Sequence, residues 1–185
     1  MGRFLTQKVR MEQCHERRYW HTLDNELYKD DDGTIYLTPR HFKTDNYTIP
    51  TFAAIIGGTP VDFRVEIAHI HDALCYSAHG VYVTLTEEEL LEKGYYRFSE
   101  NRQLWVCEDI PKEYLAKKKF TKRQCNNLFW RALCSVPIPW INRIILRIGV
   151  IFNIGWYWAA LTKRFIDFDL NRFYDKDYWE EVVPI

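Results

Sequence analysis

The first pattern of apolar and polar positions along the chain is that of two short strands, at 17–28 and 34–38. Both segments carry aromatic and β-branched residues, which favour strands. The run Asp30-Asp31-Asp32-Gly33 lies between them and supplies the polar side chains and the glycine that a tight turn uses. We therefore predict an antiparallel hairpin near the N-terminus.

Helical spacing of apolar residues dominates the chain after a turn-rich stretch at 39–60. The predicted helices span about 61–78, 86–94, 111–119, 121–134 and 140–161. A short strand at 81–85 and a hairpin with arms at 95–98 and 103–107 interrupt them. Thr86 and Glu89 have the spacing of a capping box, and Gly80 is expected to end the first helix.

This order of elements predicts an α+β fold, with N-terminal antiparallel strands or a hairpin followed by a small helical bundle. We expect one domain over 1–162, in which 80–120 forms an inserted α/β excursion that is peripheral to the core. Residues 163–185 interleave aromatic and acidic side chains. We expect them to form a C-terminal tail that serves as a contact site.

The composition supports a folded chain and excludes some partners. Hydrophobic residues make up 47% of 185 residues, which is enough for a sizeable core and excludes general disorder. Lys and Arg together number 25, as do Asp and Glu, so no overall positive charge recruits nucleic acid. The five cysteines are widely spaced without a C-x-x-C pair, which favours reduced thiols in a cytosolic protein. The first ten residues lack the apolar core of a signal peptide.

One apolar segment, Ile148 to Leu161, is free of charged residues. It is shorter than the roughly 20 residues of a spanning helix, so we expect no transmembrane helix and predict a buried C-terminal helix. Trp156, Tyr157 and Trp158 near its end leave an interfacial helix, and therefore a membrane surface, as the alternative that is not favoured.

The candidate chemistry lies in the helix predicted at 61–78. At about 100° per residue, His71 falls on the apolar face of this helix and Asp72 lies at the edge of that face. A histidine held there can act as a base near neutral pH, and the adjacent carboxylate can hold a metal cation or orient a water. The same residues also fit a core histidine beside a solvated acid. His69 lies nearly opposite His71, so the two cannot bind one metal from a regular helix.

A second polar element, Thr44-Asp45-Asn46 with Thr48, precedes Ile49-Pro50. Asp and Thr side chains bond nearby backbone in turns and proline stiffens the exit, so an ordinary turn explains the composition. The functional interpretation is that Asp45 and Thr48 are delivered beside His71. We predict that Asp45 and His71 lie within one hydrogen-bond length, directly or through one water.

These elements resemble the phage and prophage family of domain of unknown function 1353. Its G-F-x-T-D-x-x-S-x-P stretch is similar to 41–50 here, its H-D-x-x-Y to 71–75, and its A-D-x-x-F to 125–129. The resemblance implies a polar pocket of the following residues: Thr44, Asp45, Thr48, His71, Asp72, Tyr76 and Asn126.

Three departures from the family pattern fall on positions where the family has a polar side chain. Thr48 stands in place of Ser, and Cys75 stands at the Tyr position with Tyr76 next to it. Asn126 replaces an Asp, which removes a carboxylate that triad logic would use to orient the histidine. Asn126 shares a helical stripe with Phe129 and Leu133, so we expect it to face His71 or Asp72.

A weaker likeness is to phospholipases of the secreted and parvoviral type, which also carry H-D-x-x-Y on one helix. It implies that His71 activates water and that Asp72 binds calcium. The glycine-rich calcium loop of those enzymes is not recognisable, and Gly57-Gly58 is a poor remnant of it.

Two classes of function remain open. In the first, the chain is a phage-encoded virion-associated or accessory protein that binds a phage protein or another copy of itself, without a cofactor, in the host cytoplasm or the virion. In the second, it is a hydrolase with His71 as general base and Asp72 as holder of calcium or water. Asn126 and Cys75 favour the first class, because both depart from the family's polar pattern.

Overall fold

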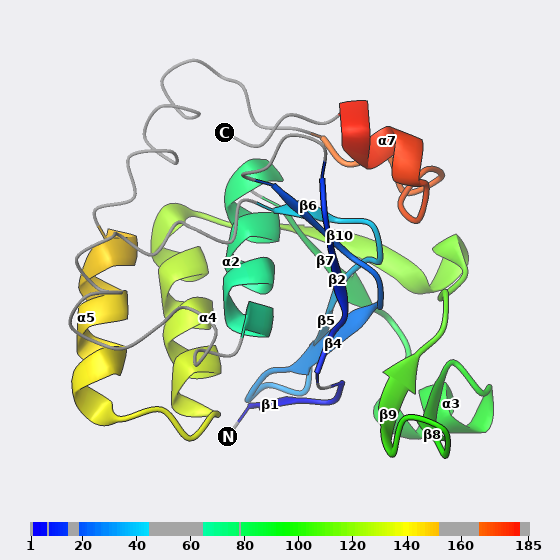
Figure 1. The fold of residues 1–185 in the computed structure, drawn as a ribbon, viewed down its shortest axis with the longest axis horizontal. Coiled ribbons are helices and arrows are strands. Elements are labelled where there is room, and N and C mark those ends of the chain that lie inside the picture. The colour runs from blue at the N-terminus through cyan, green and yellow to red at the C-terminus, as the bar shows by residue number, and fades with distance from the viewer. Residues whose placement is uncertain are drawn as a thin grey trace.

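The computed structural model describes residues 2–6, 8–14, 19–44, 65–77, 79–151 and 167–181. Its centre is a five-stranded antiparallel sheet with the strand order β1-β4-β5-β7-β10 (Figure 1). The strands are β1 (Arg3–Phe4), β4 (Glu26–Lys29), β5 (Ile35–Thr38), β7 (His79–Val83) and β10 (Leu115–Lys119). Sheet and helices together confirm the predicted α+β class.

The predicted N-terminal hairpin is present as β4 and β5, but the strand predicted at 17–28 is divided: only its end belongs to this hairpin, and Trp20–Thr22 forms a strand of another sheet. Leu27 pairs with Leu37, and both side chains are buried. Gly33 has a φ of 86°, a conformation that side chains with a Cβ rarely adopt, and the turn closes with Asp30 N–H donating to the Thr34 carbonyl at 2.8 Å. The local turn residues therefore determine this hairpin, as the sequence predicts.

Three helices form successive layers beside the sheet: α2 (Val65–Ser77), α4 (Lys122–Cys134) and α5 (Trp140–Ile151) (Figure 1). α2 packs on β5 and β7, α4 packs on α2, and α5 packs on α4. Gly80 allows the close approach of α2, because a Cβ there would meet Leu74 at 2.8 Å. Gly80 therefore lies inside β7 rather than ending the helix, which stops at Ser77.

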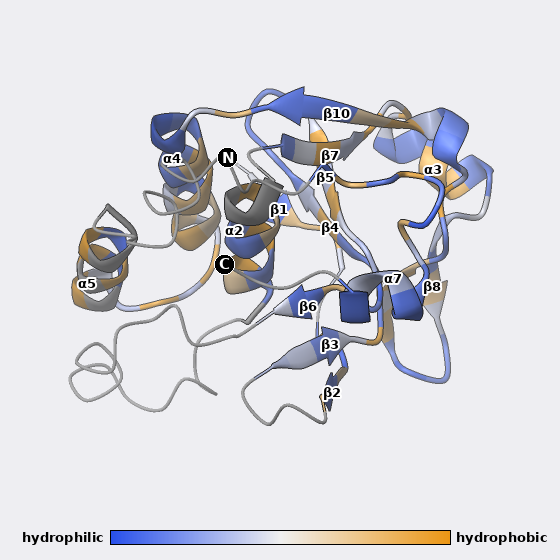
Figure 2. Ribbon diagram, turned by 90° about the horizontal axis from the view of Figure 1, so that it is seen from above, coloured by the Kyte–Doolittle hydropathy of each residue, from blue (hydrophilic) through white to orange (hydrophobic). Residues whose placement is uncertain are grey.

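A second sheet has the order β2-β3-β6, with β2 (Met11–Gln13), β3 (Trp20–Thr22) and β6 (Lys43–Thr44). The C-terminal helix α7 (Lys176–Glu181) lies beside this sheet (Figure 2). Trp179 is fully buried and packs edge-on against Phe42 with ring centroids 5.1 Å apart. Phe168 and Phe173 are buried with it. The described part of the expected tail thus belongs to the core, and these aromatic side chains do not form an external contact site.

The segment 80–120 is not peripheral, which corrects the prediction. β7 lies between β5 and β10 in the main sheet, so both ends of the segment complete the core. Only the arm, which we define as α3 (Glu87–Glu92), β8 (Tyr96–Ser99) and β9 (Leu104–Cys107), lies outside that sheet. The capping box of Thr86 and Glu89 and the β8–β9 hairpin are both present as predicted.

The prediction of a helix at 111–119 is wrong. A short 3-10 turn, η2 (Lys112–Tyr114), leads directly into β10, which pairs along its whole length with β7. Pairing with a distant strand thus overrides the local preference of this lysine-rich segment. Lysines suit an edge strand, because their charge discourages pairing with a further chain.

No helix within the described ranges is long and apolar enough to cross a bilayer. Most of the apolar segment 148–161 falls outside those ranges, so the prediction of a buried helix beyond Ile151 is not addressed.

Candidate functional site

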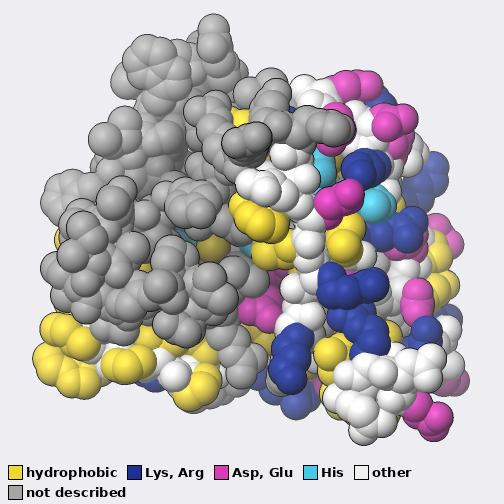
Figure 3. All heavy atoms as spheres, viewed as in Figure 1, with side chains coloured by type: hydrophobic (Ala, Val, Ile, Leu, Met, Phe, Trp, Pro, Cys, Tyr) yellow, Lys and Arg dark blue, Asp and Glu magenta, His cyan; other side chains and the backbone are white. Residues whose placement is uncertain are grey.

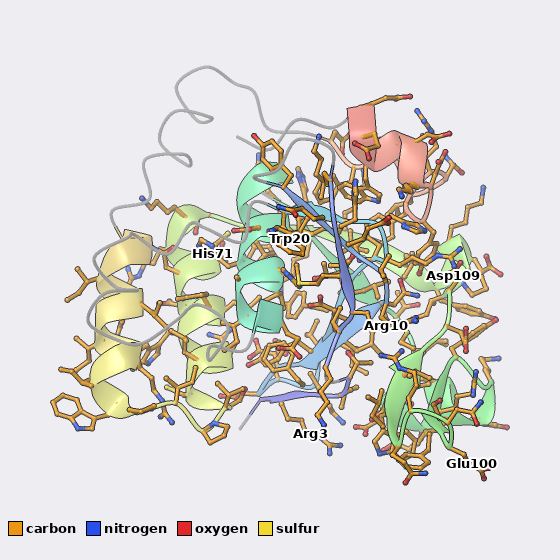
Figure 4. All side chains as sticks on the ribbon, viewed as in Figure 1. Arg3, Arg10, Trp20, His71, Glu100 and Asp109 are labelled. Atoms are coloured by element: carbon orange, nitrogen blue, oxygen red, sulfur yellow. The ribbon has the colours of Figure 1, made fainter. Side chains whose placement is uncertain are left out.

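Three of the polar residues singled out in the sequence, Thr44, His71 and Asp72, meet where α2 passes between β6 and α4. His71 lies between α2 and α4 (Figure 4). Thr44 is the last residue of β6, and β6 pairs with β3 through Thr44 and Trp20. The two sequence elements, which are separated by a turn-rich stretch, are thus brought together by tertiary packing.

Thr44 and Asp72 are directly bonded. The Thr44 hydroxyl donates to Asp72 Oδ2 at 2.6 Å, and the two residues are 0% and 1% exposed. A hydrogen bond to a buried carboxylate offsets part of the cost of removing that carboxylate from water. Asp45 and Thr48 lie outside the described residues, so the predicted contact between Asp45 and His71 stays a prediction.

His71 is buried on the apolar side of α2, as its helical position predicts, and is 2% exposed. Its ring packs against the Phe129 ring of α4 with centroids 4.9 Å apart. Its Nδ1 is 3.6 Å from Asp72 Oδ1, a distance that allows charge attraction but is too long for a hydrogen bond. We call Thr44, His71 and Asp72 the polar centre. It joins β6, α2 and α4.

Of the other predicted supporting residues, only Asn126 has a described side chain, and it makes no hydrogen bond to the polar centre. Asn126 is partly buried one turn before Phe129 on α4. Its side chain makes no hydrogen bond within the described part of the chain, so no contact to His71 or Asp72 is seen. Tyr76 lies on α2, but its side chain is outside the described set, as is that of Cys75.

A second histidine centre, which the sequence interpretation missed, lies on the sheet side of α2. His69 Nδ1 and Glu26 Oε1 are bonded, with His69 0% and Glu26 3% exposed. Burial raises the pKa of Glu26 to about 7, and the neighbouring Glu26 carboxylate raises the pKa of His69 against the opposing effect of burial. In the sequence, His69 was the residue that could have indicated this second centre. Its partner, Glu26, lies on a strand, and no local sequence pattern links the two.

A third cluster consists of Cys14, His21 and Glu180, whose potential ligand atoms all lie within 4.8 Å of one another. His21 is held at both ring nitrogens: Nδ1 is 2.7 Å from the His41 carbonyl and Nε2 is 2.9 Å from Glu180 Oε1. In the imidazolium form both N–H groups donate, so these contacts are satisfied without a metal. The Lys43 ammonium lies 3.8 Å from Glu180 Oε2 and disfavours a second cation.

Among the described residues, Asp72 is not part of any group of three potential metal ligands. If Asp72 bound calcium, as expected from the sequence, no two further carboxylate or histidine groups in the described ranges would lie close enough to bind the same ion. Cys14, Cys107, Cys125 and Cys134 are free cysteines. Two of the described cysteines, Cys107 and Cys125, are held as thiols, because burial raises the pKa of both, that of Cys125 to about 12.

Comparison of the chain with known protein families, with curated proteins and with solved structures finds no match.

Proposed function

We propose that the chain is an accessory protein of the phage family it resembles, and that it acts by binding rather than by hydrolysis. The observation that carries this proposal is the closure of the polar centre. Thr44, His71 and Asp72 are each at most 2% exposed, and one Asp72 oxygen accepts the Thr44 hydroxyl.

A general base must reach its proton directly or through one water, and a hydrolytic site must admit both water and substrate. His71 is instead packed against the Phe129 ring. Buried polar groups that bond one another also hold the elements that carry them in one arrangement. The polar centre therefore serves to fix β6 and α4 on α2, and the protein acts by binding a partner through its surface.

The hydrolase remains the second candidate, because one observation favours it. His71 and Asp72 are an adjacent base and acid, with Nδ1 3.6 Å from Oδ1. This hydrolase would need the centre to open so that water and a phospholipid or phosphoester could reach His71.

The experiment is a hydrolysis assay with phospholipid vesicles and with a phosphodiester, each with and without calcium. It compares the wild type with His71→Ala, with Asp72→Asn, and with Cys134→Ala as a control outside the centre. We expect no turnover above buffer for any of them. Circular dichroism establishes which variants are folded. If His71→Ala is unfolded, Asp72→Asn serves in its place, because the amide oxygen of Asn can still accept the hydrogen bond from Thr44.

Turnover by the wild type and by Cys134→Ala that is lost in folded His71→Ala or Asp72→Asn would overturn the proposal and restore the enzyme. Turnover that all four proteins share would equally contradict a purely binding role, and would place the reaction away from the polar centre.

A further inference from the structure

The large apolar side chains that stay exposed fall into two groups within the described ranges. The α5 patch consists of Trp140, Ile141, Ile144 and Ile148. The arm patch consists of Leu91, Phe98 and Trp105. These seven side chains are between 39% and 69% exposed, and such grouping of apolar side chains marks contact sites.

The α5 patch is a continuous stripe. At 3.6 residues per turn, its four side chains fall within an arc of about 100°. Leu146 points the opposite way and is buried, because α5 packs on α4 with that face. Figure 3 shows hydrophobic side chains gathered at the lower left of the molecule, where Figure 1 places α5.

The arm patch is built on a hairpin. Phe98 and Trp105 are directly opposite each other on β8 and β9, with ring centroids 5.7 Å apart. They continue the face on which Tyr96 and Cys107 are buried. A rigid aromatic pair that projects beyond a core loses little side-chain entropy when a partner covers it, and such residues often anchor interfaces.

The two patches lie in surroundings of opposite charge, although the whole chain is neutral. α5 carries Arg143 and Arg147 on one side of the stripe and has no acidic residue. Residues 86–109 contain seven Asp or Glu and three Lys or Arg. The exposed acids of residues 86–109 that make no ion pair in the described part of the chain are Glu88, Glu89, Glu92 and Glu100, of which Glu89 caps α3.

The two patches also lie at opposite ends of the longest axis of the molecule, with α5 at the left and the arm at the lower right (Figure 1). Figure 4 places Glu100 at the tip of the arm. One copy therefore cannot cover its own α5 patch with its own arm patch.

We propose that the α5 patch of one copy docks on the arm patch of a second copy, so that the chain assembles head to tail. This inference rests on the proposed binding function and names its partner. A symmetric contact would set Arg143 and Arg147 against themselves, whereas the head-to-tail contact opposes basic and acidic surfaces. Because each copy keeps one patch of each kind, the contact generates a ring or an open filament.

Sedimentation velocity tests this arrangement with two variants that each remove one patch. The first is Ile144→Ser with Ile148→Ser, and the second is Phe98→Ser with Trp105→Ser. We expect the wild type to form species larger than a dimer as its concentration rises, and to do so less at high salt. Each variant alone should be a monomer. Their equimolar mixture should form a dimer and nothing larger, because only one competent patch of each kind remains.

A charge variant supports the test if loss of Trp105 weakens the hairpin, since its ring stacks on buried Tyr96. Replacing Glu88, Glu92 and Glu100 with Gln should weaken assembly at low salt, whereas Glu113→Gln, at an exposed acid outside both patches, should leave it unchanged.

The following outcomes contradict the inference. A wild type that stays monomeric at every concentration excludes a second copy as the partner. Association that only the α5 variant loses indicates a symmetric contact, and a monomer that binds anionic vesicles through α5 indicates a membrane partner. The proposed function is tested by hydrolysis and this inference by sedimentation, so either one can fail without the other.

Discussion

The two buried histidines of α2 have the same backbone setting and different roles. His69 faces the sheet and bonds Glu26, whereas His71 faces α4 and packs on a phenyl ring beside Asp72. Burial raises the pKa of Glu26, and the Glu26 carboxylate raises the pKa of His69 against the opposing effect of burial. The polar centre is instead organised by the hydroxyl of Thr44.

This difference shows why an adjacent His-Asp pair is weak evidence of catalysis by itself. A perturbed pKa and a suggestive sequence motif are both used to locate active sites. In this protein a buried ion pair with perturbed pKa values, His69 with Glu26, lies on the opposite face of the helix from the motif residue His71. Both centres join α2 to a neighbouring element, so both have a structural explanation.

Removing Glu26 should have the largest effect on stability. Glu26→Ala leaves His69 buried beside a cavity, so we expect a loss of about 3–5 kcal/mol in the free energy of unfolding. Urea denaturation measures it. Glu108→Ala is the control, because Glu108 pairs with Arg97 on an exposed surface, and such pairs contribute at most about 1 kcal/mol. Equal losses in the two variants would show that the His69 centre is not closed to water.

The same centre should make stability fall as pH rises. Glu26 has a pKa of about 7 when folded and 4.5 as its ordinary value, so the folded state holds this proton more tightly. Its contribution is complete below pH 4.5 and is lost towards pH 7. His69, whose pKa is also raised, acts in the same direction above pH 6.5.

Urea denaturation at a series of pH values measures this slope, and Glu26→Gln should flatten it between pH 4.5 and about 7. Acids whose pKa is lowered, such as Asp24 and Glu87, act in the opposite direction but below their ordinary values. A slope that is unchanged in Glu26→Gln would assign the pH dependence to other groups.

Thr44→Val should have a smaller effect, confined to the polar centre. It replaces the hydroxyl that bonds Asp72 with a methyl group of similar size, so we expect a loss of about 2 kcal/mol in unfolding free energy. Thr44→Ser keeps the hydroxyl and should lose less. A Thr44→Val variant as stable as the wild type would show that the hydrogen bond contributes nothing to stability.

Asn126→Asp should have the smallest effect. It introduces a carboxylate on α4, but Asn126 is only partly buried and bonds no described side chain. We expect a change within about 0.5 kcal/mol and no gain of hydrolysis. Thermal unfolding and the hydrolysis assay check both statements, and a gain of turnover would reveal a latent catalytic site.

Features set by neighbouring residues could be predicted from the sequence. The β4–β5 turn with Gly33 and the capping box of Thr86 depend on residues within a few positions of each other, and both are present. The burial of His71 follows from the helical period alone.

Features set by distant pairing could not be predicted. β10 forms because β7 is available, and Trp179 is buried because Phe42 and its neighbours accept it. The partners Glu26 and His69 are separated by a stretch without a recognisable pattern, so neither residue identifies the other. The contact of Thr44 with Asp72 was not predicted either, because the contact expected from the sequence joins Asp45 to His71.

The central claim is that the polar centre is closed, and chemical modification of histidine tests it most directly. Diethyl pyrocarbonate is applied to the native protein, and mass spectrometry follows His71 against half-buried His79 of β7. We predict that His79 reacts in the native protein and that His71 reacts only when urea unfolds the chain. Modification of native His71 as fast as His79 would contradict the account, because it would show a centre that reagents, and therefore substrates, can reach.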